Sequence, residues 1–225
     1  MRRFAMIALL MIFSIAACAG PTNQSSAQRL VDQSTLTVES IMSSSSGPDV
    51  ARTLKSARAV IICPEVFKAG FIIGGSGGGC VLVARAAQGS WSDPAFYTIG
   101  SGSFGLQAGI ENSSIMIMIM NERALNAVIN SQFKIGADAS LAVANFGAGV
   151  GGGTTAAFNA DIVTFAENRG LFAGVSLDGA LLSTDAASNL AYYGKASDAR
   201  DIVVSMQANN PGADPLRAVL ARYGG

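Results

Sequence analysis

The chain has 225 residues, of which half are hydrophobic and only 13% are charged, so its composition excludes an intrinsically disordered protein. A chain of this length can bury the core of one domain. Histidine is absent, which removes the most common general base and the most common metal ligand. The 26 glycines favour sheet over helix, because glycine has a low helix propensity.

The N-terminus has the pattern of a secretory signal peptide. Arg2 and Arg3 precede an apolar run from Phe4 to Ile15, which is too short to span a membrane comfortably. Residues 1–17 are therefore predicted to direct export and to be removed.

The end of this segment, IAAC at 15–18, resembles a bacterial lipobox. The resemblance implies cleavage before Cys18 and acylation of that cysteine, with residues 18–27 as a lipidated tether. Ordinary cleavage nearby, with Cys18 incidental, is the alternative. Ala19 stands where an aspartate would retain a lipoprotein in the inner membrane, so we expect an outer-membrane lipoprotein that faces the periplasm.

Removal of the signal peptide takes away two arginines and leaves 13 basic against 15 acidic side chains, a net charge of −2. A weakly acidic protein lacks the overall positive charge that nucleic-acid binding requires. We therefore expect no nucleic-acid partner, and any anionic partner must meet a local basic patch.

The first half of the chain predicts two helices followed by short strands. Apolar residues at helical spacing predict a helix over 28–42, and Asp49 is expected to cap a second helix that ends at Ser56. A β-rich run at 58–63 is expected to end at Pro64. After it we expect one helical turn at 65–69 and two short strands within 70–85, around the glycine-rich run GGSGGG at 74–79.

The residues after Trp91 predict the centre of the fold. A turn signal at 92–94 precedes a segment in which Phe104, Leu106, Ala108 and Ile110 alternate with polar residues and glycines, as on a half-buried strand. The run IMIMIM at 115–120 has no polar face, which is typical of a strand covered on both sides. We expect these two strands to pair as a central hairpin, with the turn at 111–114.

The rest of the chain predicts a helix capped by Asn121, three more strands and three C-terminal helices that each begin with an aspartate cap. The expected strands cover 140–146, 158–167 and 171–182, and the expected helices cover 185–193, 198–208 and 214–223. The fold class is α+β: a glycine-rich, largely antiparallel sheet or partly closed barrel, flanked by N-terminal and C-terminal helices.

Four ordered blocks carry a resemblance to a known family. They are ARAVIICPEVFKAGFIIGGSGGGCVLVAR at 57–85, WSDPAFYTIGSGSFGLQAG at 91–109, IGADASLAVA at 135–144 and NRGLFAGVSLDGALLSTDAASNLAYYG at 168–194. Together they resemble the SYLF family. The resemblance implies one lipid-binding domain over 28–225, related to proteins tied to phosphoinositides and actin patches in eukaryotes, with no enzyme activity.

The candidate lipid-binding residues are the local cations near the N-terminal helices. Arg52 and Lys55 are three residues apart and so lie on one side of a helix; Arg58 is nearby, Arg29 lies upstream and Lys68 downstream. The family resemblance places lipid binding in this N-terminal helical region. A solvated helix face is the alternative interpretation of the same residues.

Cys63 and Cys80 remain after lipidation of Cys18. They can form a disulfide in an oxidising periplasm, or remain two free buried thiols. Two cysteines without histidine make a poor zinc site, so we expect no metal and no cofactor. The glycine run at 74–79 lacks the Lys-Ser or Lys-Thr pair of a phosphate-binding loop, which favours tight turns and bulges.

No catalytic set emerges from the sequence. Ser176 lacks the final glycine of a nucleophile elbow, and there is no histidine to activate it. The carboxylates Glu111, Asp161, Glu167 and Asp178 are scattered over the expected strands, where solvated or turn-making roles are expected. The sequence thus predicts a non-enzymatic lipid-binding lipoprotein of the bacterial envelope; the alternative is an assembly lipoprotein that docks another envelope protein.

Overall fold

The computed structural model describes residues 23–70, 73–86, 89–104, 109–130, 132–136, 141–147, 160–170, 177 and 179–225. The helices are α1 (Gln24–Ser43), α2 (Gly47–Ser56), α3 (Glu122–Asn130), α5 (Ala186–Tyr193), α6 (Ala199–Val203) and α7 (Asp214–Gly224), with a 3-10 turn η1 at Pro211–Ala213. Within the described residues, none of the helices has the length and apolar character needed to cross a membrane.

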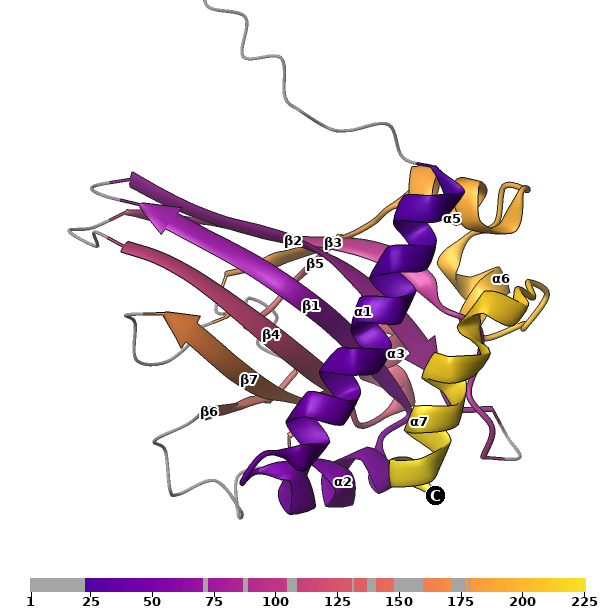
Figure 1. The fold of residues 1–225 in the computed structure, drawn as a ribbon, viewed down its shortest axis with the longest axis horizontal. Helices are drawn as coiled ribbons and strands as arrows, with labels where there is room; N and C mark the ends of the chain where they lie inside the picture. The colour runs from indigo at the N-terminus through magenta and orange to yellow at the C-terminus, as the bar shows by residue number, and fades with distance from the viewer. Residues whose placement is uncertain are drawn as a thin grey trace, which may run out of the picture.

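The strands are β1 (Ala59–Gly70), β2 (Ile73–Ala84), β3 (Ala95–Phe104), β4 (Gly109–Ile119), β5 (Phe133–Lys134), β6 (Val143–Gly147), β7 (Ile162–Gly170) and β8 (Leu181–Thr184). They form one sheet in the order β5-β8-β3-β2-β1-β4-β7-β6. Neighbouring strands are antiparallel except β6 and β7, which are parallel. The expected α+β class, with a largely antiparallel sheet and helices from both chain ends, is confirmed (Figure 1).

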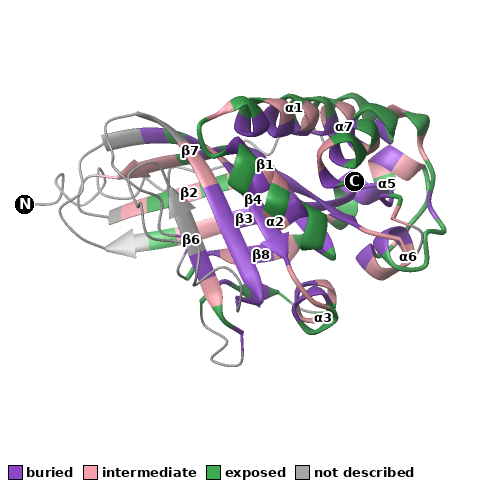
Figure 2. Ribbon diagram, turned by 90° about the horizontal axis from the view of Figure 1, so that it is seen from below, coloured by how far each residue is buried: buried purple, intermediate pink, exposed green. Residues whose placement is uncertain are grey.

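Helices cover both faces of the sheet, and strand alternation assigns each residue to one face. On what we call the α1 face, Val60, Ile62 and Met116 pack with residues of α1, α2 and α7. On the α3 face, Ile61 and Ile117 pack with residues of α3 and α6. Figure 2 shows α1 and α7 on one side of the sheet and α3 on the other. The fully buried strand at 115–119 is therefore covered on both sides, as its sequence indicates.

The predicted central hairpin is wrong. β3 pairs with β2 and β8, whereas β4 pairs with β1 and β7, so the β1–β2 hairpin lies between the two strands. The predicted turn at 111–114 is inside β4. Apolar periodicity reports which face of a strand is buried, but not which strand pairs with it, and here the partners come from further away in the sequence. Residues 105–108 lie outside the described residues.

β1 does not stop at Pro64, and the helical turn expected at 65–69 is part of the strand. The register against β4 shifts by one residue between Cys63 and Val66, so Pro64 and Glu65 together lie opposite Ser114. This is a β-bulge, where a proline without an N–H group is tolerated. The Ser114 hydroxyl donates to the Pro64 carbonyl at 2.8 Å, which replaces part of the interrupted ladder.

The glycine run at 74–79 is not a turn between two strands but the middle of β2. A side chain at Gly78 would run into the Glu65 carbonyl oxygen of the bulge in β1. Glycine is required there because the two backbones approach too closely for a Cβ. β7 likewise continues through 168–170, where a junction was expected.

The predicted caps are confirmed at three helices. The side chains of Asn121, Asp185 and Asp198 accept hydrogen bonds from the first turns of α3, α5 and α6. Asp49 and Asp214 instead lie inside the first turns of α2 and α7. α6 is shorter than predicted and ends at Val203, three residues before Met206, which has a φ of 51°.

Candidate functional site

The structure separates the five predicted basic residues into three places. Arg52 and Lys55 are exposed on α2, and Arg58 directly precedes β1. Arg29 is exposed in the first half of α1, and the helix leads from it to α2 over 14 residues, about 21 Å at 1.5 Å per residue. Lys68 is on β1 beside Glu111 of β4, on the α3 face. Cys18 lies outside the described residues.

The arginines of the α2 region are in surface ion pairs. Arg52 pairs with Asp49 at 3.0 Å and Arg58 pairs with Glu122 of α3 at 2.6 Å, and their side chains are 64% and 46% exposed. Lys55 makes no ion pair within the described part of the chain. Exposed ion pairs contribute about 0–1 kcal/mol to stability, so these arginines can leave their carboxylate partners and bind another anion.

The segment at 91–94, which carries part of the family resemblance, fastens the C-terminal helices to the sheet. The Arg217 Nε–H donates to the Trp91 carbonyl at 2.8 Å, and the Asn210 backbone N–H donates to the Asp93 carboxylate at 2.9 Å. The Tyr193 hydroxyl donates to the Pro94 carbonyl at 2.7 Å. Burial raises the pKa of Asp93, although the Asn210 N–H and Arg217 partly offset this effect. The role of this segment is structural.

Asp161 joins three segments, a role that the sequence pattern did not indicate. Its carboxylate accepts hydrogen bonds from the Asn121 side chain, from Arg123 at 2.9 Å and from the Ala142 backbone N–H at 2.8 Å. These donors favour the charged form, with the Ala142 N–H first, and lower the pKa of Asp161. The carboxylate therefore ties the start of α3 to the segments that lead into β6 and β7.

We expect Asp161→Asn to destabilise the protein in a pH-dependent way. Because the folded state lowers the pKa of Asp161, the carboxylate stabilises the fold above its unfolded pKa of about 3.9, and this contribution is lost as the pH falls through the folded pKa. The free energies of unfolding of wild type and variant, measured in urea, should differ at pH 7 and converge below about pH 4.

The control for this experiment is Asp49→Asn, since that carboxylate is 53% exposed and pairs with an exposed arginine. Its effect on the free energy of unfolding should be small at pH 7. A difference between wild type and Asp161→Asn that is the same at pH 7 and pH 3 would contradict the assignment.

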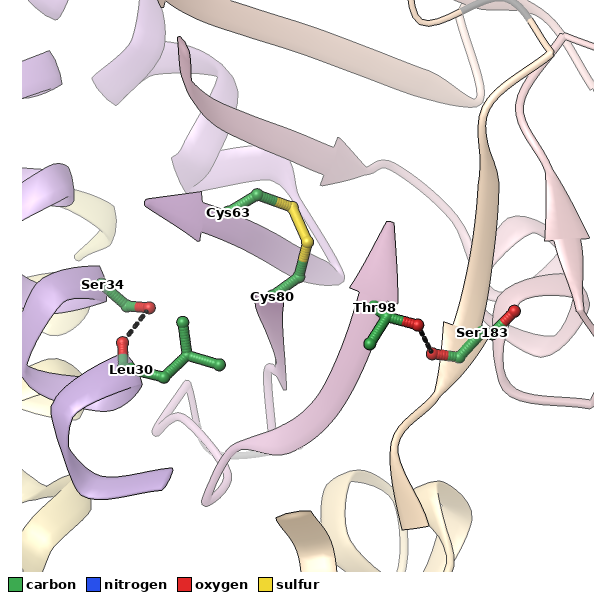
Figure 3. The surroundings of a disulfide bond; sticks show 6 residues. All are labelled: Leu30, Ser34, Cys63, Cys80, Thr98 and Ser183. Carbon is green, nitrogen blue, oxygen red and sulfur yellow. Dashed lines mark hydrogen bonds between the residues drawn. A yellow bond between two sulfur atoms is a disulfide. The ribbon is translucent and has the colours of Figure 1, made fainter. Parts of the chain in front are cut away.

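Cys63 and Cys80 are joined by a disulfide in the structure (Figure 3). They lie opposite each other on β1 and β2, with Cα atoms 4.2 Å apart, and both are fully buried on the α3 face. The bond lies directly before the bulge at Pro64 and Glu65, so it fixes the pairing of the two strands where their register shifts.

A groove that the sequence does not indicate lies between α1 and the bulge. Its volume is about 330 Å³. It is lined by Gln33, Leu36, Thr37 and Ser40 of α1, Pro64 and Glu65 of β1, and Asn112 and Ser114 of β4. No sequence signal marks it, because it forms only where α1 crosses two strands and one of them bulges.

The described residues do not assemble a catalytic or metal site. They contain no group of three or more cysteine, aspartate or glutamate side chains placed to hold a metal ion. The Glu111 carboxylate is buried and accepts from Ser113, and that of Glu167 accepts from Ser40. Ser176 and Asp178 lie outside the described residues.

Comparison with known proteins gives the family. A family model described as "Ysc84: Las17-binding protein actin regulator" matches residues 100–223, more than half of the chain. The human SH3 domain-containing YSC84-like protein 1 is 31% identical over 81% of this chain and 54% of its own length. The Xenopus laevis protein of the same name is 32% identical over 68% of this chain and 47% of its own length. Protein YSC84 of Saccharomyces cerevisiae is 29% identical over 74% of this chain and 36% of its own length.

The chain thus covers about half, or less, of the length of these relatives, and the names of the human and Xenopus laevis proteins include an SH3 domain. The family model spans β3 to α7, which includes much of the sheet and all the C-terminal helices fastened by the 91–94 segment. The chain therefore belongs to the Ysc84 family, which is the SYLF family that its four sequence blocks resemble.

Proposed function

We propose that this protein is a non-enzymatic, lipid-binding lipoprotein of the bacterial envelope. In this proposal residues 1–17 direct export, Cys18 carries the acyl anchor, and Arg52, Lys55 and Arg58 bind anionic lipid headgroups at the periplasmic side of the outer membrane. The observation that supports it best is the exposure of these three cations in one short stretch, held by nothing stronger than surface ion pairs.

The proposed anchor and the basic stretch are at opposite ends of α1. Asn23 precedes α1, α2 follows it, and the helix spans about 30 Å. The predicted tether at 18–27 is too long, because Asn23 caps α1 and residues 24–27 form its first turn. The remaining residues 18–22 span at most about 18 Å when fully extended. The Cys18 anchor and the basic stretch of α2 therefore reach one membrane surface when α1 lies along that surface. Arg29 is then close to the end of α1 that is nearer to the anchor.

Actin regulation, which the family description names, is not part of this proposal, because an exported bacterial protein does not meet cytoskeletal actin. The second candidate function is docking of another envelope protein. It is favoured by Leu190 of α5 and by Val204 and Met206 after α6, which are 50%, 46% and 40% exposed. α5 and α6 lie at the same end of the molecule (Figure 1).

The test uses a protein that lacks residues 1–18, so that the anchor does not contribute to binding. Replacement of Arg52, Lys55 and Arg58 by glutamine should weaken binding to anionic liposomes tenfold or more, because each cation near an anionic surface contributes about 1 kcal/mol. Binding to neutral liposomes should change little, and salt should reduce the difference. Cosedimentation with liposomes measures all of these affinities.

The matched control replaces Lys134 and Lys195, two exposed cations outside α1 and α2, by glutamine, and is compared with the double variant Arg52→Gln, Lys55→Gln. It removes the same charge as that double variant and should bind almost like wild type. Equal binding by wild type and the α2 variant would reject the basic stretch as the site. The docking function instead predicts no liposome binding by the protein without its anchor and a protein partner recovered by crosslinking.

A further inference from the structure

The groove between α1 and the bulge contains a solvent-accessible hydroxyl without a partner in the described part of the chain. Thr37 is 7% exposed, lines the groove and makes no hydrogen bond within the described residues. Its neighbours on α1 differ, since Ser34 donates to the Leu30 carbonyl at 2.7 Å and Thr35 to the Val31 carbonyl at 3.1 Å. The hydroxyl opens into the groove rather than being sealed off from it, so a ligand can replace the water that it would otherwise bind.

The rim of the groove provides further unused polar groups. Gln33, Glu65 and Asn112 are exposed, and none of their side chains makes a hydrogen bond or ion pair within the described residues. The two amides supply donors and acceptors, and the carboxylate supplies acceptors. The set can therefore bind several hydroxyl groups at once, each as donor or as acceptor.

Two large apolar side chains lie at the same place. Leu36 lines the groove and is 65% exposed. Phe67 is 52% exposed and is the cross-strand partner of Asn112. Val66 faces the α3 face, so Phe67 points to the α1 face, where the groove lies. Cross-strand neighbours have Cβ atoms about 5 Å apart, so the Phe67 side chain begins next to Asn112, one of the residues that line the groove.

The charge of the groove restricts the ligand. None of its lining residues is a cation, whereas Glu65 is a carboxylate, and Ser40 is bonded to the carboxylate of Glu167. Such a groove repels phosphate and other anions. A ligand that has many hydroxyl groups, no negative charge and an apolar ring face satisfies all of these features.

We propose that this groove binds a neutral carbohydrate, with hydroxyl groups bonded to Thr37, Gln33, Glu65 and Asn112 and a sugar ring packed on Phe67 and Leu36. The site is separate from the basic stretch of α2 and differs from it in ligand chemistry. The acetamido group of an N-acetylated sugar matches the amides of Gln33 and Asn112, so an N-acetylated sugar should bind more tightly than a plain glucan.

The experiment uses the full chain in a polyoxyethylene detergent, since detergents with sugar headgroups would compete. Saturation-transfer NMR measures binding of two probes, the β-1,4-linked N-acetylglucosamine trisaccharide and maltotriose. Wild type should bind the N-acetylated probe with a millimolar or lower Kd. Thr37→Val keeps the side-chain shape without the hydroxyl and should weaken binding about tenfold, and Phe67→Ala should weaken it at least as much.

Thr35→Val is the matched control, because it removes a hydroxyl from the same helix that already has a partner. It should leave the Kd unchanged. Thr37→Val should also melt close to wild type, since it keeps the side-chain shape and breaks no hydrogen bond within the described residues, which separates lost binding from lost folding. Absence of binding of both probes to wild type overturns the proposal, as does equal binding by Thr37→Val, or displacement of the probe by millimolar inorganic phosphate.

Discussion

Replacement of Gly78 by alanine is expected to destabilise the protein by about 1–3 kcal/mol, the range seen when a side chain is forced into a packed site. The new Cβ would overlap the Glu65 carbonyl oxygen and approach the Val66 Cα to 3.2 Å. Both atoms belong to the backbone of the bulge in β1, so relief requires a strand to move rather than a side chain to turn. Urea unfolding should show the loss, as a lower midpoint with an unchanged slope.

Gly77→Ala is the matched control one residue away. There the nearest atom to the new Cβ is the Ile99 carbonyl oxygen at 3.6 Å, an ordinary contact. Alanine restricts the unfolded chain more than glycine does, so this variant should be neutral or slightly stabilised. If both variants lose the same stability, the cost comes from glycine replacement in general and not from the approach of the bulge to β2.

Loss of the disulfide is expected to have an equal or larger effect. In the chain-entropy account, a bond between residues 17 positions apart contributes about 3 kcal/mol. The double variant Cys63→Ala, Cys80→Ala should lose this contribution, together with the packing of two fully buried sulfur atoms. Because the bond lies directly before the bulge, the double variant should also exchange its backbone amide hydrogens faster than wild type does. This increase should be larger in β1 and β2 than in β7.

Wild-type protein that is refolded in the presence of a reductant is the control, because it keeps both sulfur atoms in place. Its free energy of unfolding should fall towards that of the double variant. The reductant must be present during refolding, since neither cysteine is accessible in the folded protein. A reduced wild type as stable as the oxidised protein would show that the bond contributes nothing to stability.

Several local features could be read from the sequence because they depend on residues that are near each other in the chain. Asn121, Asp185 and Asp198 cap helices through their own backbone neighbours, and the apolar run at 115–119 is buried whichever strands flank it. The fold class followed from the same patterns, and the family from four ordered blocks of residues.

The pairing of the strands and the candidate sites could be determined only from the tertiary structure. β3 and β4 are adjacent in sequence but separated by the β1–β2 hairpin, because strand choice is decided by packing across the whole sheet. Pro64 and the glycines of β2 have turn chemistry, yet they lie in strands, since a bulge accepts the proline and a close backbone approach requires the glycine at 78.

The sequence by itself determined the class of the fold, the family, the helix caps and the set of cations that could meet an anionic lipid. Only the tertiary structure decided which of those cations stay together, because α1 carries Arg29 about 21 Å from its α2 end and β1 carries Lys68 on the α3 face. It also decided that Thr37, which makes no hydrogen bond within the described residues, lies beside the bulge in β1. Such a site depends on which side chains α1 brings against two strands, and local periodicity contains no information about that contact.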